Sequence, residues 1–233
     1  MLKQIRLHLS YIFCKNNLIV IFIGILIYMV FCLITSYINK PVDEQILYSV
    51  DFQNTYDYFV TSFSKLFITL FSSYLFSYSF IKNCNYIVIL KPSKGSFYIS
   101  KVISIIIVVL VMIIVFYLIY FFIGINTYWF WFSFDILIYF IRLFLVSIIL
   151  GLLSLLVSTI FYNLFPFIIV YFLFMILENF IDYQFINYLY IFVPNLVLND
   201  MNVFYSIYLL ILQFIFYFIL NYLLFNRLER FIS

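Results

Sequence analysis

Long apolar runs separated by short polar stretches dominate this sequence. The apolar and polar positions do not alternate within a run, and most runs have the roughly 20 residues that an α-helix needs to cross a bilayer core. Lipid offers the backbone no hydrogen-bonding partner, so only helices or closed barrels can span it. The pattern predicts an all-α integral membrane protein with six spans, over about 17–38, 60–81, 102–123, 136–161, 167–185 and 204–225.

The segment before the first run has a different pattern. Its apolar positions recur at helical spacing among polar residues, at Leu2, Ile5, Leu9 and Ile12. We therefore expect residues 2–15 to form an interfacial helix that lies along the membrane. His8, the only histidine of the chain, is expected to be solvated or interfacial and not a ligand.

Composition limits the chain to one membrane domain over 1–233. Hydrophobic residues make up 68% of the sequence and charged residues 9%, whereas soluble domains carry about 25% charged residues. Six spans and their loops leave no room for a second folded domain. The first span is too long for a signal-peptide core, so we expect it to be retained.

The basic residues are sorted between alternate loops. Nine of the twelve fall on one side of the predicted topology, namely Lys3, Arg6, Lys15, Lys82, Lys91, Lys94, Lys101, Arg227 and Arg230. Of the nine acids, only Glu229 falls on that side. Lysine and arginine are retained on the cytoplasmic side during insertion, so both termini are expected to be cytoplasmic.

The sequence lacks the motifs of the common catalytic sites. It contains no phosphate-binding glycine loop, no H-E-x-x-H, no Cys-x-x-Cys, and only three cysteines. We expect no catalytic, cofactor or metal site on this chain and no nucleic-acid partner. The remaining enzyme hypothesis is a membrane-embedded carboxylate and hydroxyl chemistry with Glu178 as its base.

Four charged residues fall inside predicted spans. Lys65 lies near the start of the second span, where its long side chain is expected to reach the interface by snorkelling. Arg142 and Glu178 lie at nearly the same predicted depth in the outer half of neighbouring helices, and Asp182 is one turn further out. A lone charge near the middle of a bilayer costs about 2.5–3.5 kcal/mol on insertion scales, so pairing of Arg142 with Glu178 is expected. The pair is either a structural clamp or part of a transport path.

Small and hydroxyl residues form two stripes at helical spacing. One runs along the second span, at Thr69, Ser73 and Ser77, and the other along the fourth, at Ser147, Gly151, Ser154 and Ser158. Such stripes let helices approach closely. Helix packing is one interpretation, and a polar lining of a path is the other.

The basic loop 82–101 carries an apolar stretch that an ordinary inner loop does not need. Its residues Ile89-Leu90, Pro92-Ser93-Lys94 and Lys101 stand where the membrane subunits of the type-2 ABC exporter family have an apolar pair, a proline with serine and a basic residue, and a lysine opening the third span. The chain resembles that family in this loop and in its overall layout.

This resemblance implies a coupling helix at about Cys84 to Leu90 that docks on a separate ATPase subunit. The coupling loop would comprise Asn85, Tyr86, Ile87, Val88, Ile89, Leu90, Pro92 and Lys94. It also implies an outer re-entrant element near 183–203, a second permease subunit, and ATP with Mg²⁺ bound on the partner ATPase.

We therefore expect the permease half of an ATP-driven exporter in a bacterial plasma membrane. Its apolar surface favours a hydrophobic or amphipathic cargo, such as an antimicrobial or toxin peptide. The alternative from another class is a membrane immunity or assembly protein that transports nothing. Capture of an ATPase partner separates the two.

Overall fold

The structure, a computed structural model, describes residues 2–13, 15–38, 60–75, 94–127, 134–161 and 203–227, together with 168 and 172. Every regular element in this part of the chain is an α-helix. The helices are α1 (Leu2–Ile12), α2 (Lys15–Ile38), the unlabelled helical segment 60–75, α4 (Lys94–Thr127), α5 (Phe134–Phe161) and α9 (Val203–Arg227). The prediction of an all-helical chain is confirmed for these residues.

Four of these helices are long and apolar enough to cross a membrane. The qualifying stretches are Asn17–Ser36 in α2, Tyr98–Gly124 in α4, Phe134–Val157 in α5 and Val203–Leu224 in α9. The shorter segment 60–75 lies within the predicted second span. The predicted fifth span and the loop 183–203 lie outside the described residues, apart from 168 and 172.

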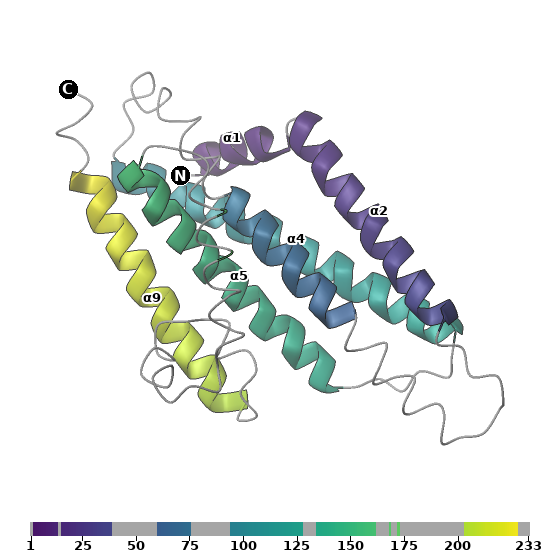
Figure 1. Cartoon of the computed structure of the whole chain (residues 1–233). Coiled ribbons are helices and arrows are strands. Elements are labelled where there is room, and N and C mark those ends of the chain that lie inside the picture. Colours follow the sequence, from purple (N-terminus) through teal and green to yellow (C-terminus); the bar gives the residue numbers. More distant parts are fainter. Residues whose placement is uncertain are drawn as a thin grey trace.

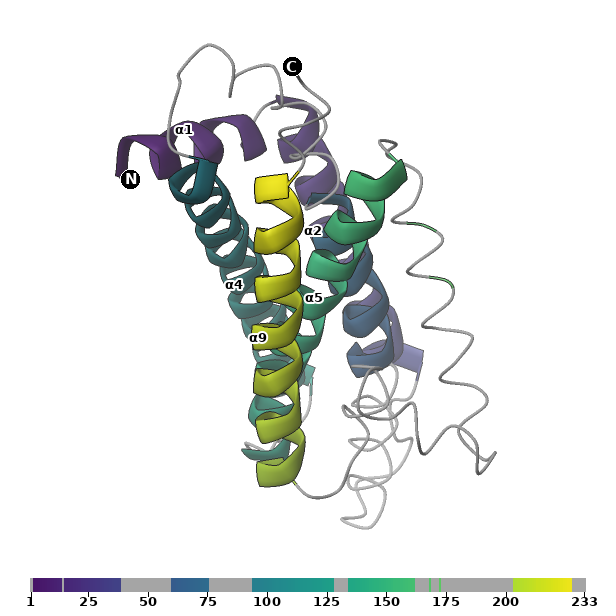
Figure 2. The same cartoon turned by 90° about the vertical axis from the view of Figure 1, so that its left-hand side faces the viewer.

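The long helices run side by side, and α1 crosses one end of the bundle they form (Figure 1). α2 and α4 begin at the end that carries α1, whereas segment 60–75, α5 and α9 begin at the opposite end (Figures 1 and 2). The first residues of α1 and the last residues of α9 therefore lie at the same end of the molecule.

α4 is the central helix, because it packs against α1, α2, α5 and α9. It begins at Lys94 and not near Val102, so residues 94–101, which we expected to belong to a loop, are helical. Packing explains the earlier start. A side chain at Gly95 would press on the hydroxyl of Tyr222, and the Tyr98 hydroxyl lies 3.4 Å from the Phe218 carbonyl of α9, to which it donates a hydrogen bond.

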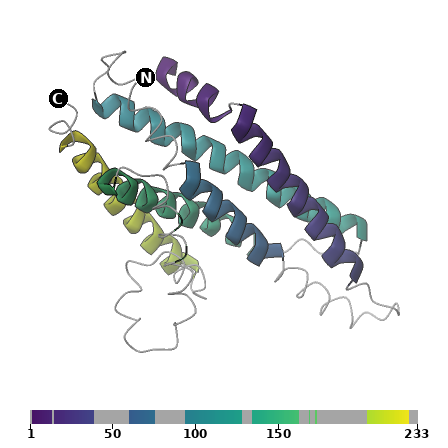
Figure 3. The ribbon, with the colours of Figure 1, turned by 45° about the horizontal axis from the view of Figure 1, so that its top comes forward.

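Aromatic rings join α2, segment 60–75 and α4. The ring centroids of Tyr28 and Phe116 are 4.1 Å apart, and those of Phe67 and Phe116 are 5.5 Å apart. Gly24 lies directly under the ring of Phe67, in space that a larger side chain would need. Offset ring pairs of this kind add stability beyond the apolar area they bury, so they hold segment 60–75 against α2 and α4 (Figure 3).

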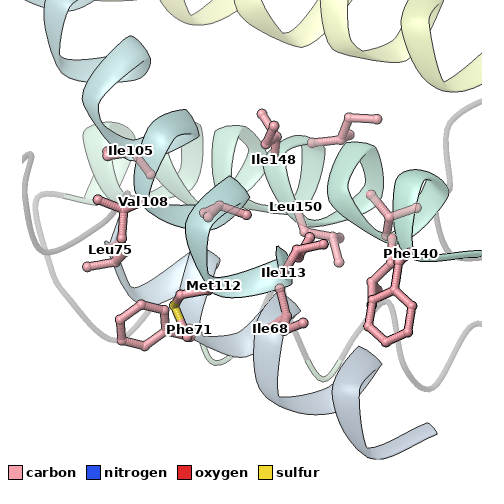
Figure 4. Close-up of a cluster of buried hydrophobic side chains, with 14 of the residues drawn as sticks. Ile68, Phe71, Leu75, Ile105, Val108, Met112, Ile113, Phe140, Ile148 and Leu150 are labelled. Atoms are coloured by element: carbon pink, nitrogen blue, oxygen red, sulfur yellow. The ribbon is translucent and has the colours of Figure 1, made fainter. Parts of the chain in front are cut away.

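The centre of the bundle is an apolar cluster contributed by segment 60–75, α4 and α5 (Figure 4). Ile68, Leu75, Ile105 and Leu150 are among its almost completely buried members. Large aliphatic side chains interdigitate here as they do in soluble cores, where packing density approaches that of organic crystals. The cluster fixes the two helices that carry the predicted small-residue stripes.

Candidate functional site

Segment 60–75 and α5 meet along a contact that we call the polar seam, defined by two hydrogen bonds between the helices. The Ser72 hydroxyl donates to the Ser147 carbonyl across 2.7 Å, and both residues are fully buried. Toward the end of the bundle away from α1, the Tyr139 hydroxyl donates to the Thr61 carbonyl across 3.2 Å. Residue numbers rise together along the seam, so the two helices are parallel.

Three hydroxyls near the seam bond to their own helix. Thr69 donates to the Lys65 carbonyl at 2.6 Å, Ser147 donates to the Leu143 carbonyl at 2.6 Å, and Ser64 donates to the Thr61 carbonyl at 2.9 Å. Bonds to the preceding turn satisfy a buried hydroxyl without water. These side chains can therefore pack helix against helix in an apolar medium.

Two members of the predicted stripes differ from the rest. The hydroxyl oxygens of Ser73 and Ser154 are buried and make no hydrogen bond to any described residue. Gly151 is also buried on α5. Ser77 lies outside the described residues, and Ser158 is on α5 without a described side chain. Among the stripe positions with a described side chain, Ser73 and Ser154 are thus the ones whose hydroxyls can still bond a group beyond the described helices.

The residue that bridges the two helices, Ser72, was not part of the predicted stripe. The sequence places Thr69, Ser73 and Ser77 on one line, and Ser72 sits beside that line, three residues after Thr69. Spacing alone does not tell which of two adjacent serines faces a neighbour. The helix partner has to be known first.

Two cations lie at one level of the bundle. Lys65 is only 8% exposed, although its place near the start of the predicted second span led us to expect its side chain to reach the interface. At ~1.5 Å per residue, Lys65 lies about 6 Å beyond Thr61, and Arg142 lies about 4.5 Å beyond Tyr139. Because Thr61 and Tyr139 are bonded, Lys65 and Arg142 occupy nearly the same layer.

Arg142 is partly buried on α5. Its predicted partner Glu178, and Asp182, lie outside the described residues, so the pairing remains a prediction. The layer combines one buried and one partly buried cation, in the half of the bundle farthest from α1. A carboxylate or phosphate would be the complementary group for such a layer.

The apolar stretch predicted to couple to an ATPase, together with Pro92, lies outside the described residues. Lys94 is the first residue of α4. Lys101 lies two turns into α4 and is 3% exposed, packed beneath α1. Lys101, the last residue of the predicted loop 82–101, therefore lies against the N-terminal helix α1.

A second buried polar cluster joins α1 to α4. Ser104 donates to the Ile5 carbonyl of α1 across 3.3 Å. His8 is 2% exposed and faces α4 because α1 docks on that helix. Of the two expected placements, solvated or interfacial, the solvated one is therefore wrong. Burial, with a smaller contribution from the nearby Lys101 charge, lowers the pKa of His8 to about 4.

Neither cluster has the composition of a metal site. In the described ranges no three His, Cys, Asp or Glu residues gather to hold an ion. Cys32, the cysteine within these ranges, is a buried free thiol on α2. The sequence matches no protein-family model, and no curated protein and no solved structure matches it.

Proposed function

We propose that this chain is a multi-pass membrane protein and serves as the permease half of an ATP-driven exporter. The observation that supports this best is the arrangement at one end of the bundle. There α1 lies across the first turns of α4, immediately after the loop whose motif resembles the exporter family (Figure 1). In this proposal a movement of the loop is passed to α4, the helix in contact with most of the others.

The directions of the helices support six crossings. α5 ends at the end of the bundle that carries α1, and α9 begins at the opposite end (Figure 2). We infer one further crossing between α5 and α9, in addition to α2, segment 60–75, α4, α5 and α9. Six crossings would leave both termini on one side, and the distribution of lysine and arginine supports the cytoplasmic side.

The cargo proposed is hydrophobic or amphipathic, and the layer of Lys65 and Arg142 is where its polar group would meet the protein. The layer lies beside the polar seam, which holds segment 60–75 against α5. In this proposal the cargo path runs along the surface that the chain shares with its mate, and the charged layer selects the headgroup of the cargo. A second permease subunit would supply the other wall, and a separate ATPase would bind ATP and Mg²⁺.

The test is capture of an ATPase by the tagged chain from its native membrane. We expect Ile87→Asp and Leu90→Asp to abolish capture, because a charge in the apolar docking stretch is costly to bury. Ser10→Asp, at an exposed side chain on α1, is the matched control and should retain the ATPase.

Two outcomes would contradict this proposal. If no ATPase is captured by the unmodified chain, the non-transporting immunity or assembly function becomes the better explanation. If Ile87→Asp and Leu90→Asp leave a captured ATPase bound, the coupling loop is misassigned.

A further inference from the structure

α1 presents one side to α4 and leaves the opposite side uncovered. His8 and Ile12 are 2% and 3% exposed on the docked side. On the other side Leu2 is 83% exposed and Phe13 is 42% exposed. The helical hydrogen bonding extends to Phe13, whose amide donates to the Leu9 carbonyl across 2.9 Å. The exposed side thus includes large apolar side chains at both ends of the helix.

The order of residues around α1 is informative. At about 100° per residue, the docked side is followed by partly buried apolar residues, then by exposed apolar ones, and then by exposed polar and basic ones. In that order the residues are His8 and Ile12, then Ile5 and Leu9, then Leu2 and Phe13, then Arg6, Ser10 and Lys3. An apolar edge bordered by basic residues is the pattern of a helix lying at a lipid headgroup boundary.

The same end of the bundle is basic throughout the described residues. α1, the start of α2, the start of α4 and the end of α9 contribute Lys3, Arg6, Lys15, Lys94, Lys101 and Arg227. The described ranges hold one acid, Asp135, and it lies at the start of α5 at the opposite end (Figure 1). The charge that complements this end is negative.

We propose that the exposed side of α1 binds the anionic headgroups of a phospholipid surface through Lys3 and Arg6, with Leu2 and Phe13 inserted beside them. The anchor point is fixed by the docked side, because His8, Ile12 and the bond from Ser104 to the Ile5 carbonyl set the rotation of α1 about its axis. This inference uses the membrane placement proposed above and is independent of the exporter assignment.

The attraction between basic side chains and anionic headgroups sets the expected strength of the binding of α1 to lipid. A basic residue near an anionic membrane surface contributes about 1 kcal/mol, which corresponds to about a fivefold change in an equilibrium constant. Two such residues should together change the equilibrium for release of α1 by about 25-fold. The interaction should weaken as the salt concentration rises, since these side chains are exposed.

The experiment uses the full chain in lipid nanodiscs made of phosphatidylcholine alone or mixed with phosphatidylglycerol. Hydrogen exchange of the peptide covering α1 is measured in each. We expect stronger protection with phosphatidylglycerol, and a loss of that gain in high salt. In Lys3→Gln/Arg6→Gln the difference between lipids should disappear, whereas the charge-conserving control Lys3→Arg/Arg6→Lys should keep it.

Equal protection of α1 in the two lipids overturns the inference, as does a lipid difference that survives in Lys3→Gln/Arg6→Gln. The lipid and salt comparisons need only the unmodified chain, so they test the binding of α1 to anionic lipid even if the double variant does not fold. Capture of an ATPase is read separately and should be unaffected, so failure of one proposal is distinguishable from failure of the other.

Discussion

α2 and α5 are both predominantly apolar, yet the structure uses them in opposite ways. Over their candidate spans α2 is the more apolar of the two, but only 22% of its span is buried, against 61% for α5. The exposed side of α2 consists of large aliphatic and aromatic residues such as Phe22, Ile27 and Val30. α5 turns Ser147, Gly151 and Ser154 inward.

This difference shows that hydropathy marks a span but not its inner face. Lipid tails are as apolar as the interior of the helix bundle. Large aliphatic side chains therefore gain little free energy by facing the bundle interior and not the lipid. Small and hydroxyl residues do distinguish the faces, because they allow close approach and need hydrogen-bonding partners. Hence the small polar residues of α5 lie inside, whereas most of the large aliphatic side chains of α2 lie outside.

The largest expected effect comes from a charge on the exposed side of α2. Ile27 is 50% exposed near the middle of the helix. If that side faces lipid, Ile27→Lys should cost about 2.5–3.5 kcal/mol in membrane insertion, measured as the inserted fraction in a glycosylation assay. Ser10→Lys, on the exposed side of α1, is the control and should cost little. Equal tolerance of both changes would show that α2 does not face lipid.

A large side chain in the polar seam should have the next largest effect. Ser147→Phe would force segment 60–75 and α5 apart and should destabilise the folded chain by about 1–3 kcal/mol. The same side chain at Ile27 should cost less than about 0.5 kcal/mol, as exposed substitutions usually do. Thermal unfolding in detergent, followed by loss of the monodisperse peak, compares the two. A smaller loss of stability for Ser147→Phe than for Ile27→Phe would show that segment 60–75 and α5 do not pack closely along the polar seam.

A buried amide between α5 and α9 gives a smaller, more specific prediction. The side-chain amide of Asn221 donates to the Leu152 and Tyr217 carbonyls, both at 2.9 Å. Hydrogen bonds between membrane helices contribute about 0.6 kcal/mol on average and about 1.7 at most. Asn221→Leu should therefore lower stability by roughly that amount, whereas Ile219→Leu on the exposed side of α9 should leave the unfolding midpoint unchanged.

The subtlest prediction concerns the only histidine. Because burial and Lys101 lower the pKa of His8 to about 4, the neutral ring is favoured by docking of α1. The docked state is fully favoured above pH 6.5 and loses this contribution as pH falls from about 6.5 to about 4. A single histidine signal in an NMR titration should have its midpoint near 4. A midpoint near 6.5 would show that α1 is not docked as described.

The sequence was sufficient to predict helical structure, because continuous apolar runs admit few other solutions in lipid. α5, for example, covers Phe134–Phe161 where the pattern predicts a span over 136–161. It was not sufficient to predict which side of each helix is covered. The burial of His8, Lys65 and Lys101 depends on neighbours that are distant in sequence.

The candidate site was predictable only in part, for the same reason. Stripes of small residues could be read from spacing, but the bridging role of Ser72 depends on the position of Ser147, which is 75 residues away. The early start of α4 likewise depends on contacts from Tyr98 to α9 and from Ser104 to α1. Contacts of this kind have no local signature.

The central claim is that the chain crosses a membrane with the ends of α1 and α9 on the cytoplasmic side. Protease-cleavable tags at each terminus, probed in intact and in permeabilised cells, test it most directly. If both ends are cytoplasmic, both tags are protected in intact cells and cleaved after permeabilisation. Cleavage of either tag in intact cells would contradict it.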